Sequence, residues 1–293
     1  YDYNYLTALE KVTNHHVEFS NTLPRERYWR IRSKKVILAQ GAFERPLVFA
    51  DNDRPGIMMA SAGQKYLSRY GVLPGKSVVL FTNNDHAYLT AFEFVEKGAK
   101  VTVVDTRDLL NAKISEKCKS LNITVFKSYS VIKTYGDKKV NKIEIQQVDK
   151  DQNQLTGEVE NIQTDCVLMS GGWNPAVQLF SQSRGKLKYD LKINTFVPDK
   201  IIENQKIIGS NNGQFNLQEN LNESFEAGIA AANELNFNSV EKVNWTGKEE
   251  IEFTHSDVEP YMLGKKKVTK GSKHFIDFQN DVTAADIFLA QRE

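Results

Sequence analysis

Cysteine is scarce in this sequence of 293 residues, which contains only Cys118 and Cys166. The two lie far apart, and neither has a second cysteine at the short spacing of a redox pair. This excludes a Cys-X-X-Cys redox centre and any all-cysteine zinc or iron–sulfur site, so we expect no metal. Cys166 lies within an apolar run and is predicted to be a buried small hydrophobe.

A charge bias and long apolar runs are also missing. The 38 Lys and Arg residues nearly balance the 37 Asp and Glu residues, for a formal net charge of +1. Proteins that bind nucleic acid or anionic lipid normally carry a clustered basic excess, so neither partner is expected. No apolar stretch approaches the roughly 20 residues that cross a bilayer, and the first residues do not form a signal peptide. These absences predict a soluble, cytoplasmic protein.

The sequence does contain an alternation of apolar strands and helical patterns, which is typical of an α/β fold. The apolar run Val36–Ala39 ends before Gly41 and predicts a buried parallel strand. A turn-rich stretch then leads to a predicted helix over Ser61–Arg69, which Gly71 ends.

The clearest supersecondary unit is a strand at Val78–Phe81, a helix through Glu96 and a second strand at Val101–Asp105. This spacing is that of a dinucleotide-binding unit with an acid at the tip of its second strand. The intervening loop, Thr82–Ala87, lacks the glycines that let backbone amides approach a pyrophosphate, and Asp85 adds negative charge there. The sequence therefore predicts the strand–helix–strand architecture of a dinucleotide-binding unit, but it disfavours ligand binding by this loop.

Two later stretches follow the order expected for the rest of this nucleotide domain. The segment Val140–Val148 alternates as in an antiparallel strand, and an apolar run then ends in Gly171 and Gly172 before Pro175. This order is typical of the second nucleotide domain of two-domain flavoprotein reductases.

A short strand at Lys206–Ile208 is followed by Gly209, a turn ending in Gly213 and a long helix up to about Leu235. Free amides and the dipole at the start of such a helix stabilise an anion or a polarised ring edge, by about 0.3 to 1 kcal/mol at exposed sites. Most such reductases have an acid in this turn that bonds the ribityl chain of the flavin, whereas this sequence has Asn211 and Asn212. Either these asparagines belong to an altered cofactor site or they only cap the helix.

Several motifs in combination resemble the alpha subunit of heterotetrameric sarcosine oxidase. They are Gln40–Met58, Phe81–Asp85, Ser170–Pro175 and Asp277–Thr283, and they span nearly the whole chain. Gln40 departs from the family's usual Thr before the glycine.

The resemblance implies a two-dinucleotide-binding-domain flavoprotein fold, of the FAD/NAD(P)-binding, glutathione/thioredoxin reductase-like type. The chain opens at Tyr1 without an initiator Met, and we expect it to be truncated at both ends, with the first glycine fingerprint upstream. The expected segments are the C-terminal part of the first nucleotide domain (1–73), an inserted second Rossmann-like domain with a β-meander (74–175), a return to the first domain (176–240), and a linker with the start of a helical module (241–293).

The resemblance also implies cofactors and partners. The alpha subunit of this family binds NAD and assembles with beta, gamma and delta subunits. FAD in the beta subunit oxidises sarcosine, electrons pass to FMN at the alpha–beta interface, and oxygen is reduced to peroxide. A folate-binding domain outside the present chain captures the one-carbon unit as methylenetetrahydrofolate.

The site residues we predict are binding residues, and no catalytic residue is expected, because no Ser-His-Asp, Cys-His or paired-carboxylate arrangement can be singled out. Gly41 and Ala42 are predicted to bind the cofactor because they end a strand against its groove. Resemblance to the family's NAD contacts implies four more cofactor-binding residues: Asn212, Gly213, Leu217 and Glu219. Near the end of the chain, Thr283 is predicted to cap a helix over Ala284–Arg292.

Two other functions stay open from the sequence. One is a subunit of a related amine or imino-acid dehydrogenase, acting on opines or hydroxyproline, although such subunits usually retain cysteines in the helical module. The other is a non-catalytic assembly module that keeps the nucleotide fold and binds no nucleotide.

Overall fold

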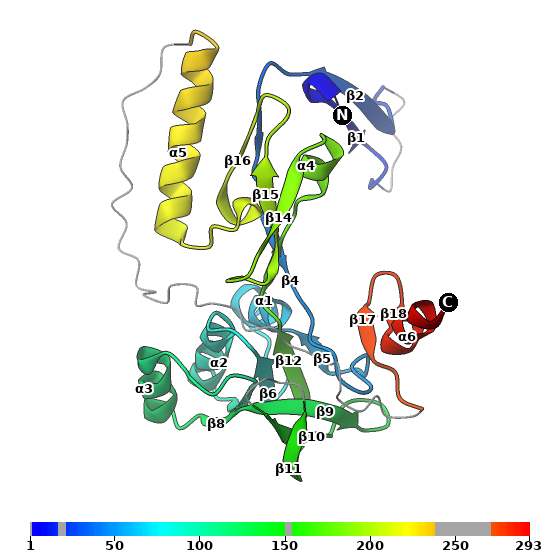
Figure 1. The fold of residues 1–293 in the computed structure, drawn as a ribbon, viewed down its shortest axis with the longest axis vertical. Helices are drawn as coiled ribbons and strands as arrows, with labels where there is room; N and C mark the ends of the chain where they lie inside the picture. Colours follow the sequence, from blue (N-terminus) through cyan, green and yellow to red (C-terminus); the bar gives the residue numbers. More distant parts are fainter. Residues whose placement is uncertain (1, 17–21, 150–153, 238–270) are drawn as a thin grey trace. The chain divides into compact units, whose positions relative to one another are not determined.

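The computed structural model describes residues 2–16, 22–149, 154–237 and 271–293, and Figure 1 shows their elements. The chain divides into two compact units. Unit 1 consists of Tyr1–Phe43, Asn174–Asp190 and Thr195–Glu252. Unit 2 consists of Glu44–Trp173, Leu191–Asn194 and Phe253–Glu293.

Unit 2 is built on a five-stranded sheet with strand order β5-β12-β6-β7-β8, in which every pair is parallel. Its strands are β5 (Ile57–Met59), β6 (Ser77–Thr82), β7 (Lys100–Asp105), β8 (Thr124–Lys127) and β12 (Cys166–Ser170). The middle of each central strand, such as Val78–Phe81 of β6, is apolar on both faces because a parallel sheet is covered on both faces.

Alternate residues of these strands enter two separate cores, as the two-residue period of a strand requires. Leu80 and Leu168 pack with side chains of the helices, whereas Phe81 and Val167 pack with the meander. The helices are α1 (Ala60–Tyr70), α2 (Ala87–Glu96) and α3 (Ala112–Ser120). The meander is the antiparallel sheet of β9 (Tyr129–Tyr135), β10 (Lys142–Val148) and β11 (Leu155–Gln163).

Unit 1 contains a pair of parallel strands, β3 (Val36–Leu38) and β16 (Gln205–Ile207). Leu38, Ile207 and the fully buried Phe180 form its core. Two antiparallel ribbons belong to the same unit, with their strands at β1 (Tyr5–Lys11), β2 (Glu26–Arg32), β14 (Lys186–Asp190) and β15 (Thr195–Lys200). The helices of unit 1 are η1 (Asp2–Asn4), α4 (Gln178–Gln182), η2 (Gly209–Asn212) and α5 (Leu217–Glu234). Two short strands, β4 (Ala42–Glu44) and β13 (Trp173–Pro175), lie where the sequence passes from one unit to the other.

The last segment of the chain is held to unit 2 by the loop at Asp51 and Asn52. Asn52 Nδ2 donates to the carbonyl of Phe275 at 2.8 Å, and the Phe275 amide donates back to Asn52 Oδ1 at 2.9 Å. The segment contains β17 (Phe275–Asp277), β18 (Val282–Thr283) and α6 (Ala284–Arg292). Thr283 and Asp286 form a capping box at the start of α6, which confirms the predicted cap.

The α/β fold class predicted from the sequence is confirmed, and the predicted helix at Ser61–Arg69 corresponds to α1, which ends in a left-handed Gly71. The first unit boundary falls after Phe43, whereas the sequence suggested a division after residue 73. The difference arises because β5 pairs with β12 in the sheet of unit 2 and α1 contacts α2, so residues 57–70 belong to unit 2. None of the helices that the structure describes is long and apolar enough to cross a bilayer.

Truncating the core of unit 2 tests this packing. Leu168 is 1% exposed, so Leu168→Ala is expected to lower the free energy of unfolding by about 2–5 kcal/mol through lost burial and a residual cavity. The matched control is Val159→Ala on β11, where the side chain is 46% exposed and a change within about 0.5 kcal/mol is expected. Denaturant unfolding of both variants measures this, and equal losses would contradict the assigned core.

The two cysteines offer a second test. Burial raises the pKa of Cys166 to about 12 and that of Cys118 to about 11, and nearby Asp165 and Asp105 respectively add to the two shifts. Almost no reactive thiolate therefore exists at pH 8. We expect Ellman's reagent to titrate neither thiol within minutes in the native protein and both in 6 M guanidinium. Rapid titration of either thiol in the native protein would show that it is not buried.

Candidate functional site

The candidate site lies at the carboxyl ends of the two parallel strands of unit 1. Ile207 stands opposite Leu38 in the register, and the Ile208 amide donates to the Leu38 carbonyl at 3.1 Å. Because the strands are parallel, the segment that follows β3 and the segment that follows β16 leave the sheet at the same edge. Ligands of open parallel sheets bind outside this edge.

A tight turn follows β16. Gly209–Asn212 form the 3₁₀ helix η2, which Gly213 ends with a left-handed backbone at φ +77°. The Gly213 amide donates to the Ser210 carbonyl at 3.2 Å, and the Gln214 amide donates to the Gly209 carbonyl at 3.2 Å. The left-handed region is accessible to glycine without strain, and this is the physical reason for Gly213 at the end of the turn.

Asn211 is the central polar side chain of the turn. It is fully buried, and its Nδ2 donates to Oε1 of Gln40 at 3.3 Å. Its Oδ1 is buried without any donor. A buried acceptor left without a donor costs about 1–3 kcal/mol, so this oxygen is an unfilled hydrogen-bonding position at the sheet edge.

The start of α5 forms the neighbouring part of the site. Asn216 is the N-cap residue, and its side chain accepts from the Glu219 amide at 2.9 Å. The Glu219 carboxylate accepts from the side-chain amide of Gln214. Leu217, on the first turn of α5, leaves 59% of its surface exposed. The helix start thus has one satisfied amide, one acid and one exposed apolar side chain.

The segment after β3 approaches the turn through its backbone. Gly41 has φ +79°, and a Cβ added there would lie 3.8 Å from Ser210 Oγ. Ala42 follows as the first residue of β4. The structure therefore brings Gln40 and Gly41 together with Ser210 and Asn211, across a sequence separation of 171 residues for the Gln40–Asn211 bond.

The predicted cofactor residues occupy several places around this edge. Gly41 and Ala42 follow β3, Asn212 and Gly213 end the turn, and Leu217 and Glu219 belong to the first turn of α5. Asn212 is exposed, whereas its neighbour Asn211 is buried. Cofactor binding by these six residues stays a prediction.

Sequence reasoning missed three residues that build the site. Asn211 lies beside the predicted Asn212, and only its burial distinguishes it. Gln40, which departs from the family pattern, bonds to Asn211, and no local sequence signal indicates this contact. Glu223, in the second turn of α5, accepts from the Gly209 amide at 3.3 Å and pairs with Lys206 at 3.6 Å, and so connects the turn to the helix.

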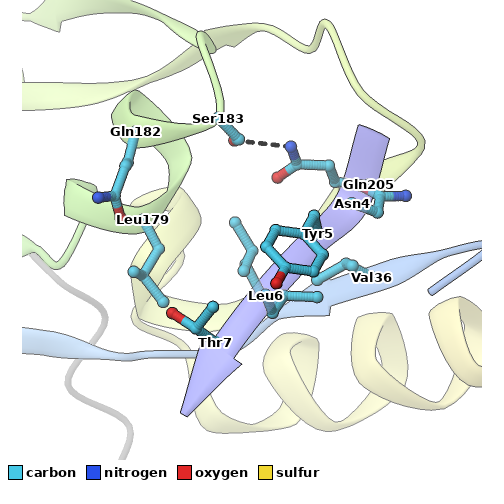
Figure 2. A pocket seen from close by; sticks show the side chains of 10 residues that line it. Asn4, Tyr5, Leu6, Thr7, Val36, Leu179, Gln182, Ser183 and Gln205 are labelled. Atoms are coloured by element: carbon cyan, nitrogen blue, oxygen red, sulfur yellow. Dashed lines mark hydrogen bonds between the residues drawn. The ribbon is translucent and has the colours of Figure 1, made fainter. Parts of the chain in front are cut away.

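A pocket of about 150 Å³ occurs elsewhere in unit 1, beside β1 and α4 (Figure 2). It is lined by Val36 and Leu38 of β3 and by Gln205, the first residue of β16, together with residues of β1 and α4. Gln205 Nε2 already donates to Ser183 Oγ at 2.6 Å. The pocket contains none of the predicted cofactor residues, and we do not assign the nucleotide to it.

Within the described ranges, no three His, Cys, Asp or Glu side chains are placed to hold a metal ion. The groups at the candidate site are amides, glycines and carboxylates, whose chemistry suits hydrogen bonding to a ligand.

Comparison with known proteins places the chain in a family. The family model described as pyridine nucleotide-disulphide oxidoreductase matches residues 6–199. The chain is 33% identical to the sarcosine oxidase alpha subunit of Corynebacterium sp. (strain P-1), over 99% of this chain and 30% of that protein. It is 35% identical to the sarcosine oxidase alpha subunit of Rhizobium meliloti (strain 1021), over 100% of this chain and 28% of that protein.

Among solved structures, thioredoxin reductase of T. acidophilum shares the fold, with a TM-score of 0.52 and 19% identity over 66% of this chain and 62% of that one. The chain thus spans about 30% of the length of its curated relatives and carries the fold of a flavoprotein reductase. On the match to residues 6–199, the chain belongs to the pyridine nucleotide-disulphide oxidoreductase family.

Proposed function

We propose that this chain is the NAD-binding core of the alpha subunit of a tetrahydrofolate-dependent sarcosine oxidase. Such an enzyme demethylates sarcosine to glycine and forms peroxide and methylenetetrahydrofolate. Support comes from the identity of 33–35% with sarcosine oxidase alpha subunits, which extends over essentially the whole chain. The sequence motifs at Gln40–Met58 and Ser170–Pro175 support the same assignment.

The observation that carries the nucleotide assignment is the buried Oδ1 of Asn211, which has no donor. It lies at the carboxyl edge of β3 and β16, where parallel sheets bind nucleotides. The ribose hydroxyls of NAD are donors that would satisfy this oxygen. A carboxamide serves this role without the negative charge that a carboxylate would place near the pyrophosphate.

The surrounding residues suit a ribose and a ring more than a phosphate. Asn216 already caps α5, and Glu219 puts a negative charge on its first turn, so an anion gains little from the helix dipole there. The exposed Leu217 offers apolar contact to a base. Gly41 and Gly213 allow the backbone to approach the ligand closely.

Within this proposal, the residues of the chain bind and orient the nucleotide and carry out no proton transfer. NAD, when bound, supplies a nicotinamide ring that accepts or donates hydride. FMN at the interface with the beta subunit, FAD in the beta subunit and a folate domain outside this chain complete the proposed enzyme. The proposed location is the cytoplasm, and the proposed partners are beta, gamma and delta subunits.

Removing the unpartnered acceptor tests the proposal. Asn211→Leu replaces the carboxamide with an apolar side chain of similar volume, so we expect NAD to bind about tenfold more weakly because its hydroxyl loses an acceptor. The melting temperature should change little, since the loss of the bond to the exposed Gln40 is offset by the removal of a buried unpaired oxygen. Calorimetric titration and thermal unfolding give the two readouts. An affinity within twofold of the wild type would contradict a role for Asn211.

The turn itself is tested by Gly213→Val. A β-branched residue at φ +77° distorts the turn, and we expect more than tenfold loss of NAD affinity. The matched control is Gly71→Val, which imposes a similar backbone strain at φ +66° on the end of α1, with open space around the new side chain. Equal affinities for the two variants in the same titration would count against the turn as part of the site.

A further inference from the structure

Unit 2 contains a second edge at which a nucleotide fold would bind its ligand. The carboxyl ends of β6 and β7 lie side by side, with Thr82 opposite Asp105 in the register. In a dinucleotide-binding fold, the loop after the first strand holds the pyrophosphate, and the acid at the end of the next strand accepts from a ribose hydroxyl. Asp105 has the position of this acid, and the loop Thr82–Ala87 has the position of the phosphate loop.

Two amides of this loop, and the amide that follows it, already donate to acceptors within the protein. The Asn84 amide donates to Thr82 Oγ1 at 3.1 Å, and the Ala87 amide, at the start of α2, donates to Asn84 Oδ1 at 3.2 Å. The Tyr88 amide donates to the Asp85 carbonyl at 3.1 Å. Asn84 is fixed in turn by bonds from its Nδ2 to the backbone and side-chain oxygens of Ser170. A pyrophosphate would have to displace these bonds to gain the same donors.

Both oxygens of Asp105 are likewise occupied. Oδ1 accepts from the backbone amide and Nε of Arg107, each at 3.0 Å. Oδ2 accepts from Arg107 Nη2 and from the Tyr88 hydroxyl, each at 2.8 Å. Little acceptor capacity is left for a ribose hydroxyl.

Arg107 connects the acid to the loop. Its Nη1 donates to Asp85 Oδ1 at 2.7 Å, so one guanidinium bridges two carboxylates. Burial alone would lower the pKa of Arg107, but the bonds and charges of Asp105 and Asp85 outweigh burial and raise it. Burial, together with Asp105, raises the pKa of the Tyr88 hydroxyl. Arg107 therefore stays charged and Tyr88 stays a donor at any working pH.

Each side chain of the cluster is nearly inaccessible to solvent, as Asn211 is in unit 1, but here the buried polar atoms are paired with one another. The exposed fraction is 0% for Tyr88 and Asp105, 3% for Asp85 and 4% for Arg107. With two carboxylates and one guanidinium, the cluster carries a net charge of −1, which disfavours the approach of a pyrophosphate.

We infer that Asp85, Tyr88, Asp105 and Arg107 close the nucleotide edge of unit 2, so that this unit binds no dinucleotide and NAD is confined to unit 1. The second half of this inference rests on the proposed function, whereas the closure of unit 2 does not. In unit 2 the nucleotide-binding fold has a structural role only, and the ion-paired cluster occupies the position that a ligand would take.

Photolabelling of the whole chain locates the nucleotide directly. The probe is the 8-azidoadenine analogue of NAD, and labelled peptides are mapped by mass spectrometry, with an NAD-dependent dehydrogenase labelled in parallel as a positive control. We expect label in peptides that cover residues 36–43 or 206–220, at more than ten times the level in residues 82–108. Label concentrated in residues 82–108 would overturn the inference. Labelling of neither region beside a labelled control would contradict the proposed function and support closure.

Substitution of the buried acid is a second test. Asp105→Asn removes a charge that a ligand-binding acid would use, yet we expect the NAD affinity of the folded variant to stay within twofold of the wild type. The melting temperature should fall, because Arg107 loses one of its two carboxylate partners. A drop in affinity of more than tenfold in the folded variant would place the ribose at Asp105 and overturn the inference. If the variant does not fold, photolabelling of the wild type decides whether unit 2 binds the nucleotide.

Discussion

The parallel pairing of β16 with β3 is the constraint on which the candidate site depends. The bond from the Ile208 amide to the Leu38 carbonyl fixes the register of the two strands. Because the strands run in the same direction, the segments that follow them emerge together. Gln40 then meets Asn211, and Gly41 approaches Ser210. A slip of one residue in this register would turn Leu38 and Ile207 out of the core and would separate the two halves of the site.

The two units share one structural feature, the carboxyl edge of a parallel sheet, but differ in how the polar atoms at that edge are hydrogen-bonded. Each presents the carboxyl edge of parallel strands followed by a helix, which is where nucleotide folds bind. In unit 1, this edge retains a buried acceptor without a donor and exposes Asn212 and Leu217. In unit 2, the corresponding atoms are paired within the protein by Arg107 and Asn84. A fold match alone therefore does not say which edge binds, and the hydrogen-bonding state of each edge is the basis of the proposal for unit 1.

Much of the fold could be predicted from the sequence because its signals are local. Apolar runs such as Val78–Phe81 predict buried parallel strands, Gly71 predicts a helix end, and Thr283 predicts a cap. The candidate site could be predicted only in outline. The glycine turn at Gly213 was visible in the sequence, but the choice between Asn211 and Asn212 depends on burial, which tertiary packing sets. Likewise, the absence of glycines disfavoured binding by the loop at Thr82, while nothing local indicated that Arg107 would bridge Asp85 and Asp105.

The most direct test of the central claim is a crystal structure of the protein soaked with NAD. The account predicts electron density for the nucleotide at the carboxyl ends of β3 and β16, with a ribose hydroxyl within hydrogen-bonding distance of Asn211 Oδ1. The cluster around Arg107 should be unchanged in the same crystal. Density for the nucleotide against Asp105, with the Arg107 side chain displaced, would contradict the account.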